Sequence, residues 1–269
     1  MTPTTPIFSR PPALVGHRGL GRGVVAGQEQ NTLGSFLGAL DAGIDWVEVD
    51  VRRTCDDELF VVHDAAFTDG AFLTAMTGAQ AATHGALAIE ELLEALPPAA
   101  GVVFDVKSSL EDASRPAAAT TATLLARLGD RRLGERPAVA LSFDPAALQH
   151  MREQAPRLPL GLLTWLRFPV GHAVAAAAHL DVQLLAVHAG SLWPNAATAP
   201  VDLPSLQRVV TSVHESDREL IVWCPADESQ TRSLVAAGVD AIVVDDVPRH
   251  VQSLSRVPPP RPAQEGWHR

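Results

Sequence analysis

Residues 45–51 read Asp45-Trp46-Val47-Glu48-Val49-Asp50-Val51, which is typical of an apolar β-strand. Side chains alternate along a strand, so Glu48 and Asp50 point to the same face. Two carboxylates on an apolar strand are costly to bury unless a cation meets them. A hard divalent cation with oxygen ligands is the simplest such partner, and a salt bridge to Arg18 or Arg52 is the structural alternative.

Outward from this strand, short apolar runs alternate with amphipathic segments for about eight units. This pattern favours a single-domain α/β fold, a (β/α)₈ TIM barrel, over a doubly wound sheet, and the sequence has no glycine-rich dinucleotide fingerprint. Strands are predicted at 15–17, 46–51, 102–106, 138–141, 160–163, 184–187, 220–223 and 241–244, with a further extended run at 59–62. Helices are predicted at 32–42, 89–96, 117–128, 145–154, 171–179, 204–215, 229–237 and 247–253.

The barrel domain is predicted to span residues 13–256, between a flexible N-terminus (1–12) and a Pro-rich tail (257–269). Residues 1–12 lack the basic start and apolar core of a signal peptide. No apolar run approaches the roughly 20 residues of a membrane-spanning helix, so no stable membrane insertion is expected. These features indicate a cytoplasmic protein.

The formal net charge of −10 argues against binding to nucleic acid or to anionic membranes, since both require a cationic surface. Cys55 and Cys224 are too far apart in sequence to suggest a disulfide framework. We expect both to be buried, reduced thiols without a chemical role.

Polar residues follow the apolar runs where strands end, and the carboxyl ends of barrel strands form the active site of this fold. His17 and His63, each in a polar break after such a run, are predicted to act as an acid/base pair around the metal. The structural alternative is a pair of turn histidines. Arg18, Asp105, Lys107, Ser142, His188 and Trp223 also lie at strand ends, whereas the other histidines, including His250, are predicted to face solvent.

The motifs resemble those of the glycerophosphodiester phosphodiesterase family over nearly the whole chain. The resemblance rests on His17-Arg18-Gly19, Asn31-Thr32, residues 43–51, His63-Asp64, Phe104-Asp105-Val106-Lys107, Ser142-Phe143-Asp144, Val222-Trp223, residues 237–240 and Asp246-x-Pro248.

The resemblance implies that Glu48, Asp50 and Asp105 bind one divalent cation, Ca²⁺ or Mg²⁺. It implies that His17 and His63 act as general base and general acid. Arg18 and Lys107 would neutralise the phosphodiester, and Trp223 would either line the substrate pocket or pack in the core. The implied activity is hydrolysis of a small glycerophosphodiester to sn-glycerol 3-phosphate and an alcohol, in phospholipid turnover.

Three features depart from the family pattern. Gln30 stands where the family has glutamate, Asp105 replaces the usual third glutamate, and the segment 64–89 is short. A lysophospholipase D-type activity on longer lipids is therefore the second hypothesis, and a degenerate barrel that serves as a binding module is the third. The head group, the metal, the order of the two histidines and the oligomeric state are left open by the sequence.

Overall fold

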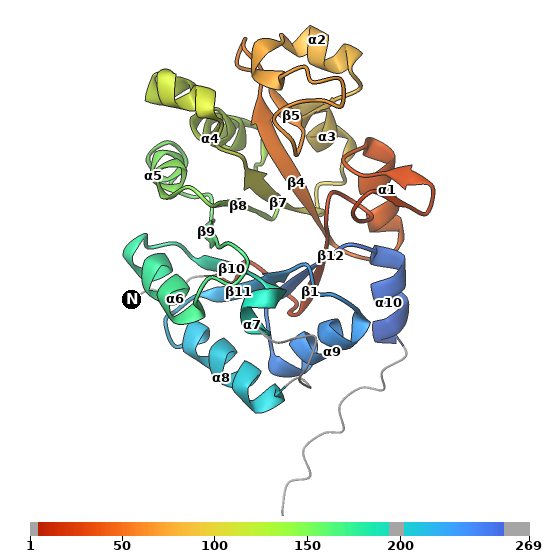
Figure 1. Ribbon diagram of the computed structural model, residues 1–269, viewed down its shortest axis with the longest axis vertical. Helices are drawn as coiled ribbons and strands as arrows, with labels where there is room; N and C mark the ends of the chain where they lie inside the picture. Colours follow the sequence, from red (N-terminus) through yellow and green to blue (C-terminus); the bar gives the residue numbers. More distant parts are fainter. Residues whose placement is uncertain (1–4, 194–201, 256–269) are drawn as a thin grey trace, which may run out of the picture.

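The computed structural model describes residues 5–193 and 202–255, and in these ranges it forms the predicted (β/α)₈ barrel (Figure 1). The first strand, β1, pairs with both the last strand β12 and with β4, which closes the sheet into a ring. The parallel barrel strands are β1 (Ala13–Gly16), β4 (Trp46–Arg53), β7 (Gly101–Val106), β8 (Ala138–Ser142), β9 (Leu160–Leu163), β10 (Leu184–His188), β11 (Glu219–Trp223) and β12 (Ala241–Val244).

Helices surround the strand ring in Figure 1. They begin and end at local signals: Thr32 caps the start of α1, and Gly238 ends α9 with a φ of 86°. The outer helices are α1 (Leu33–Asp41), α3 (Ile89–Ala95), α4 (Thr121–Arg132), α5 (Pro145–Gln154), α6 (Val170–His179), α8 (Leu203–His214), α9 (Glu228–Ala237) and α10 (Val247–Ser255).

Several elements differ from the sequence-based expectation. The helix predicted at 117–128 begins only at Thr121, after a 3₁₀ turn at Ala117–Ala119, because the Thr120 side chain caps the helix start. The extended run near residue 60 forms β5 (Leu59–Val61), which pairs antiparallel with β4. Elements that were not predicted are the β2–β3 hairpin (Val24–Val25, Gln28–Glu29), α2 (Gly78–Thr83), β6 (Leu87–Ala88) and α7 (Ala189–Leu192).

On β4 and β7, the side chains that point into the barrel change from apolar to polar along the strand. On β4, Trp46 lies at the amino end, and Glu48 and Asp50 follow on the same face. On β7, Val103 precedes Asp105 in the same way. The buried apolar layers include Val15, Val139, Leu141, Leu184, Ala186, Ile221, Ala241 and Val243. The strand direction therefore gathers the inward polar groups at the carboxyl end.

The amino end of the barrel is closed by aromatic side chains. Phe8 is 1% exposed, and its ring centroid lies 4.8 Å from that of Trp46. Trp46 fits because the facing residue is Gly101, where a Cβ would lie 2.3 Å from the indole. The backbone N–H groups of Ile7 and Phe8 donate to the Glu219 carboxylate. Flexibility of residues 1–12 stays a prediction, and this packing argues against it for residues 7 and 8.

Two other expectations concern membrane insertion and the C-terminal tail. In the described ranges, no helix has the length and apolar character needed to cross a membrane. The tail predicted at 257–269 lies outside the described residues.

His250 of α10 is buried, so the expectation that it faces solvent is wrong. Its Nδ1 lies 2.9 Å from the hydroxyl of Thr231 on α9, and burial lowers the pKa of His250. An unfolded histidine titrates near pH 6.5, so below that pH the unfolded state binds a proton that the folded state does not.

We therefore expect the free energy of unfolding to fall as the pH drops below about 6.5, by up to about 1.4 kcal/mol per pH unit from this one group. Urea unfolding at about pH 7.5 and about pH 5.5 tests this. His250→Gln should reduce the difference between the two pH values, and His172→Gln, at an exposed position on α6, should leave it unchanged. An equal pH dependence in all three proteins would contradict the expectation.

Candidate active site

Three carboxylates meet at the carboxyl end of β4 and β7. Asp50 is the register partner of Asp105 on the neighbouring strand, and Glu48 precedes Asp50 on the same face of β4. All three residues offer oxygen atoms that lie within 4.8 Å of one another. Glu48 and Asp50 are buried. The fold therefore concentrates negative charge at a point with little water.

Two cations partly balance this cluster. The Lys107 Nζ lies 3.0 Å from Asp50 Oδ1 and also contacts Asp105. The Arg18 Nε lies 3.2 Å from Asp50 Oδ2, and the Arg18 backbone N–H donates to Glu48 Oε2 over 3.0 Å. Asp50 is thus shared by both cations. Within residues 5–193 and 202–255, the contacts of Glu48 are the backbone donor and the His17 imidazole, whose Nε2 lies 3.8 Å away.

The pKa values of the three carboxyl groups reflect how unequally Arg18 and Lys107 are shared among them. Burial alone would raise the pKa of Asp50, but Lys107 and Arg18 lower it below its usual value. Burial and the charge of Asp50 raise the pKa of Glu48 to about 8. Burial also raises the pKa of Asp105, despite the nearby Lys107. Two of the three acids therefore lack sufficient positive charge around them.

A divalent cation fits this deficit. Asp105 Oδ1 is buried and, among the residues that the structure describes, no hydrogen-bond donor contacts it. An unsatisfied buried carboxylate oxygen is costly, and an all-oxygen donor set suits Ca²⁺ or Mg²⁺. Glu48 and Asp105 have the greatest unused capacity to bind such an ion, because the oxygens of Asp50 already face Lys107, Arg18 and Asn31.

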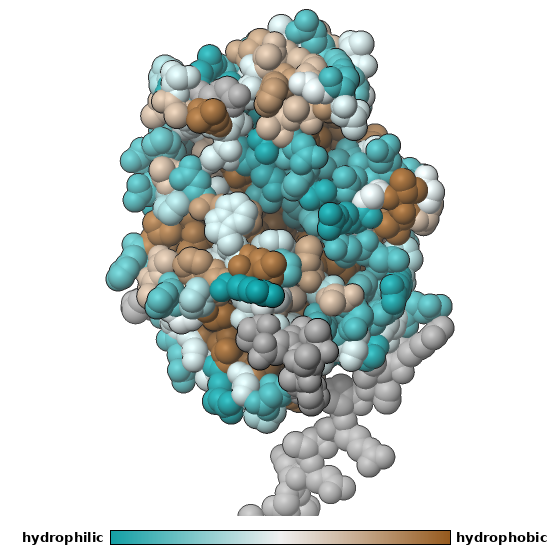
Figure 2. All heavy atoms as spheres, in the orientation of Figure 1, coloured by the Kyte–Doolittle hydropathy of each residue, from teal (hydrophilic) through white to brown (hydrophobic). Residues whose placement is uncertain are grey.

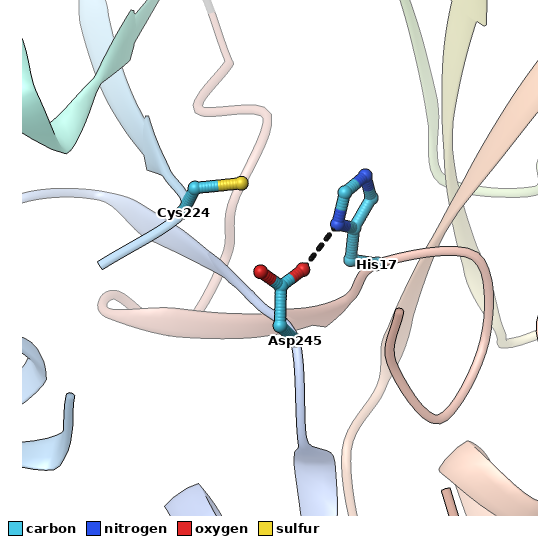
Figure 3. A group of neighbouring side chains, drawn as sticks. All are labelled: His17, Cys224 and Asp245. Carbon is cyan, nitrogen blue, oxygen red and sulfur yellow. Dashed lines mark hydrogen bonds and ion pairs between the residues drawn. The ribbon is translucent and has the colours of Figure 1, made fainter. Parts of the chain in front are cut away.

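His17 follows β1 and lies beside the acidic cluster. Its Nδ1 contacts the carboxylate of Asp245, which follows β12 (Figure 3). Its Nε2 lies 3.8 Å from Glu48 Oε2. Burial acts to lower the pKa of His17, but the contact with Asp245, the neighbouring Cys224 and the charge of Glu48 together raise it to about 10. His17 therefore carries a proton at neutral pH in this environment.

His63 follows β5 and contributes a second imidazole with a different protonation preference. Its Nδ1 lies 2.8 Å from Asp64 Oδ1, and its backbone carbonyl accepts from Arg52 Nε over 2.8 Å. Asp64 is 81% exposed, compared with 35% for Asp245, so water weakens its effect. Burial lowers the pKa of His63. The charge of Asp50 acts to raise it and the charge of Arg18 acts to lower it, and the pKa stays below its usual value. The lowered pKa favours the uncharged form of this imidazole.

A cavity of about 890 Å³ opens over these groups. It is lined by all the predicted site residues except Asp50, which is fully buried. Aromatic rings form one wall: Trp165 stacks on Phe143 at a centroid distance of 4.1 Å, and Trp223 meets Phe143 edge-on at 6.2 Å. Figure 2 shows hydrophilic and hydrophobic surface side by side on the face that is viewed. The cavity thus combines a charged side with an apolar side, and Trp223 lies in its wall.

Comparison of the sequence with models of known protein families identifies the family of this chain. The model of the Glycerophosphoryl diester phosphodiesterase family matches residues 17–249. The chain belongs to this family. Members of the family are phosphoric diester hydrolases, and the match begins at His17 and includes both histidines and all three carboxylates.

Solved structures with the same fold include three proteins whose reported names place them in this class. The chain has 20% identity to the Thermotoga maritima glycerophosphodiester phosphodiesterase (TM-score 0.69, 90% of this chain and 98% of that one). It has 23% identity to a putative enzyme of Silicibacter pomeroyi (TM-score 0.73, 93% and 95%). It has 20% identity to an Oleispira antarctica phosphodiesterase, solved in complex with the product sn-glycerol-3-phosphate (TM-score 0.71, 91% and 97%).

A curated relative is the glycerophosphocholine phosphodiesterase gde1 of Schizosaccharomyces pombe. It is 34% identical over 110 residues, which is 39% of this chain. The matched part spans only 9% of the length of that relative.

The structure brings together the eight residues to which the resemblance assigns a role, and it adds others. Asp245 orients His17, and Asn31 donates to Asp50 Oδ2 over 3.1 Å. Asp245 comes directly after a barrel strand, so the strand-end rule that selected His17 could also have selected Asp245. Asn31 has a φ of 60°, and its contact with Asp50 depends on a loop conformation that no pattern in the sequence predicts.

Gln30, at the position where the family has glutamate, has a defined contact set. Its Oε1 accepts from Arg18 Nη1 over 3.0 Å and from the Gly23 backbone N–H over 2.9 Å. The uncharged Gln30 amide therefore positions the Arg18 guanidinium by a hydrogen bond and does not neutralise its positive charge. Cys55 is exposed and Cys224 is partly exposed, so the expectation of buried thiols is wrong for both.

Proposed function

We propose that this chain hydrolyses glycerophosphodiesters to sn-glycerol 3-phosphate and an alcohol, with a divalent cation and two histidines. The observation that carries the proposal is the placement of His17 and His63 in one cavity, beside three carboxylates whose oxygen atoms lie within 4.8 Å of one another. The product bound to the Oleispira antarctica relative supports the same choice of product.

The groups that would bind the phosphodiester lie on the charged side of the cavity. Arg18 and Lys107 line it and retain donors that can face the non-bridging oxygens. Glu48, Asp50 and Asp105 would hold Ca²⁺ or Mg²⁺, which supplies further charge stabilisation as a Lewis acid. Trp223 and Phe143 would contact the carbon skeleton on the opposite side.

The two histidines divide the proton transfers. His17 is protonated at neutral pH because Asp245 stabilises its imidazolium, so it is assigned as the general acid for the leaving alkoxide. His63 is neutral, and with Nδ1 held by Asp64 its Nε2 can accept the proton of the nucleophile, which makes it the general base. Each transfer is worth about 10²–10⁴-fold in rate.

A panel of glycerophosphodiesters tests the proposed function. Glycerophosphocholine, glycerophosphoethanolamine and glycerophosphoglycerol should be hydrolysed, and a chelator should abolish turnover until Ca²⁺ or Mg²⁺ is restored. Release of sn-glycerol 3-phosphate should match release of the alcohol. If the barrel were only a binding module, no diester in the panel would be turned over with either ion.

Metal affinity should depend on pH through Glu48. Its carboxyl has a raised pKa of about 8 and must lose its proton before it can bind an ion. The apparent affinity for Ca²⁺ or Mg²⁺ should therefore rise by up to about tenfold per pH unit until about pH 8 and then level off. Calorimetry in buffers of different ionisation enthalpy measures the released proton. Glu48→Gln should remove this release, and an unchanged release in that variant would contradict the assignment.

A lysophospholipase D-type activity on longer lipids is the second candidate, and one observation favours it. Trp165 is 65% exposed and Leu166 is 53% exposed, and Trp165 lines the cavity mouth. An apolar rim of this kind could contact an acyl chain. If lysolipids are the substrate, Trp165→Ala should raise KM for lysophosphatidylcholine and leave KM for glycerophosphocholine unchanged. Equal effects on both would remove the long-chain candidate.

The cytoplasm is the proposed setting. Both cysteines are free, and the net charge of −10 disfavours anionic surfaces. The proposed catalytic unit is the barrel domain predicted at residues 13–256. Its partner is a small-molecule diester, and no nucleic acid is expected.

A further inference from the structure

Three different metal-binding side chains converge at the carboxyl ends of adjacent strands β1, β12 and β11. They are His17, Asp245 and Cys224, each of which directly follows its strand (Figure 3). Backbone hydrogen bonds fix their positions: the His17 N–H donates to Val244 O over 3.1 Å, and the Cys224 N–H donates to Val243 O over 3.3 Å. The convergence is therefore built into the barrel register.

The donor atoms of this group are close enough to share one ion. An imidazole nitrogen, the Cys224 sulfur and an Asp245 oxygen lie within 4.8 Å of one another. In Figure 3 the sulfur and the carboxylate both point toward the Nδ1 side of the His17 ring. Cys224 and His17 also line the cavity, so an ion can reach them.

The mixed donor set distinguishes this group from the acidic cluster beside it. Glu48, Asp50 and Asp105 offer only oxygen, which suits hard cations. One nitrogen, one sulfur and one oxygen suit Zn²⁺, and three protein ligands leave a fourth position for water.

A nucleophilic Cys–His–Asp triad is the competing interpretation, and the geometry excludes it. In such a triad the nucleophile and the aspartate contact opposite ring nitrogens of the histidine. Here Asp245 contacts Nδ1, the sulfur lies on the same side, and Nε2 faces Glu48. The three groups are arranged around a common point instead of along a relay.

We propose that His17, Cys224 and Asp245 form a second metal site, which binds a thiophilic divalent ion of the Zn²⁺ class and inhibits the enzyme when occupied. Metal ligation requires a thiolate and a neutral imidazole, so binding releases the protons that these groups carry. An ion on Nδ1 takes the place of the proton that Nδ1 shares with Asp245. The Nε2–H remains, but it then belongs to a metal-bound neutral imidazole instead of an imidazolium, so it is a weaker acid toward the leaving group. The inhibitory part rests on the proposed function of His17, whereas the binding part does not.

Cobalt(II) gives a test of binding that is independent of turnover. Chelator-treated protein is first saturated with Mg²⁺ to fill the acidic cluster and is then titrated with Co²⁺. Wild type should develop a thiolate-to-cobalt charge-transfer absorption in the near ultraviolet with one equivalent, and Zn²⁺ should abolish it by displacement. Cys224→Ser should lack the absorption, and Cys55→Ser, which changes the other free thiol, should retain it. The same absorption in Cys224→Ser, or none in wild type, overturns the site.

Inhibition is then measured with glycerophosphocholine and Mg²⁺. Zn²⁺ should inhibit wild type and Cys55→Ser alike. Measured against its own rate without Zn²⁺, Cys224→Ser should need at least about tenfold more Zn²⁺ for the same fractional inhibition. Equal sensitivity of all three proteins would overturn the inhibitory role. If no diester is hydrolysed at all, the proposed function fails while the cobalt result still decides the metal site.

Discussion

His17→Ala is expected to lower kcat for glycerophosphodiester hydrolysis by about 10²–10⁴-fold. The variant removes the imidazole whose proton would go to the leaving alkoxide, and alanine cannot donate one. Because the acidic cluster and Lys107 remain, KM should change much less than kcat. Initial rates with and without chelator, for the variant and for wild type, measure the effect.

A matched control comes from a second histidine–aspartate pair. His214 Nε2 lies 2.8 Å from Asp240 Oδ2, on α8 and at the opposite end of the barrel from the cavity. His214→Ala therefore removes a similar pair without touching the site and should keep full activity. Circular dichroism and thermal unfolding should show that both variants fold. Equal rates for His17→Ala and wild type would remove His17 from the mechanism.

Asp105→Asn is expected to weaken Ca²⁺ or Mg²⁺ binding by about 10–100-fold and to lower turnover at subsaturating metal. The change removes one negative charge and leaves a neutral amide where the structure has an unsatisfied carboxylate oxygen. Lys107 also loses a charged partner, although its contact with Asp50 remains. Metal titrations by calorimetry measure the change.

Two further variants sharpen this test. Asp105→Glu restores the carboxylate that the family usually carries and should retain metal binding. Asp45→Asn alters an exposed carboxylate at the opposite end of β4, where it pairs with Arg10, and should leave metal binding unchanged. An unaltered titration in Asp105→Asn would exclude this residue from the ligand set.

The barrel strands could be predicted because each is a continuous apolar run that is buried on both faces. Residues 241–244, for example, form β12 with the predicted bounds. The short elements between β5 and α3 are not predictable from periodicity, because β6 has two residues and α2 has six, too few to establish a period. The alanines before Thr121 favour a helix that starts at residue 117, but α4 starts four residues later because the Thr120 side chain caps it there.

Within the site, the sequence predicted which side chains gather but not how they share charge. Glu48 and Asp50 are two residues apart on one strand, yet Asp50 has a lowered pKa and Glu48 a raised one. The difference arises from Lys107 and Arg18, whose side chains reach Asp50 from other elements. Such distances depend on barrel register and loop conformation, which local patterns do not encode.

Phe8 and Trp46, which close the amino end of the barrel, affect the order in which products would leave the cavity. With the amino end filled in the described part of the chain, molecules can enter and leave the cavity only through its mouth. Under the proposed function, the fragment that lies deeper, beside Glu48 and Asp105, would therefore leave only after the outer fragment has gone. That last-departing fragment should compete with incoming diester, so the phosphate-bearing product is expected to be the competitive product inhibitor.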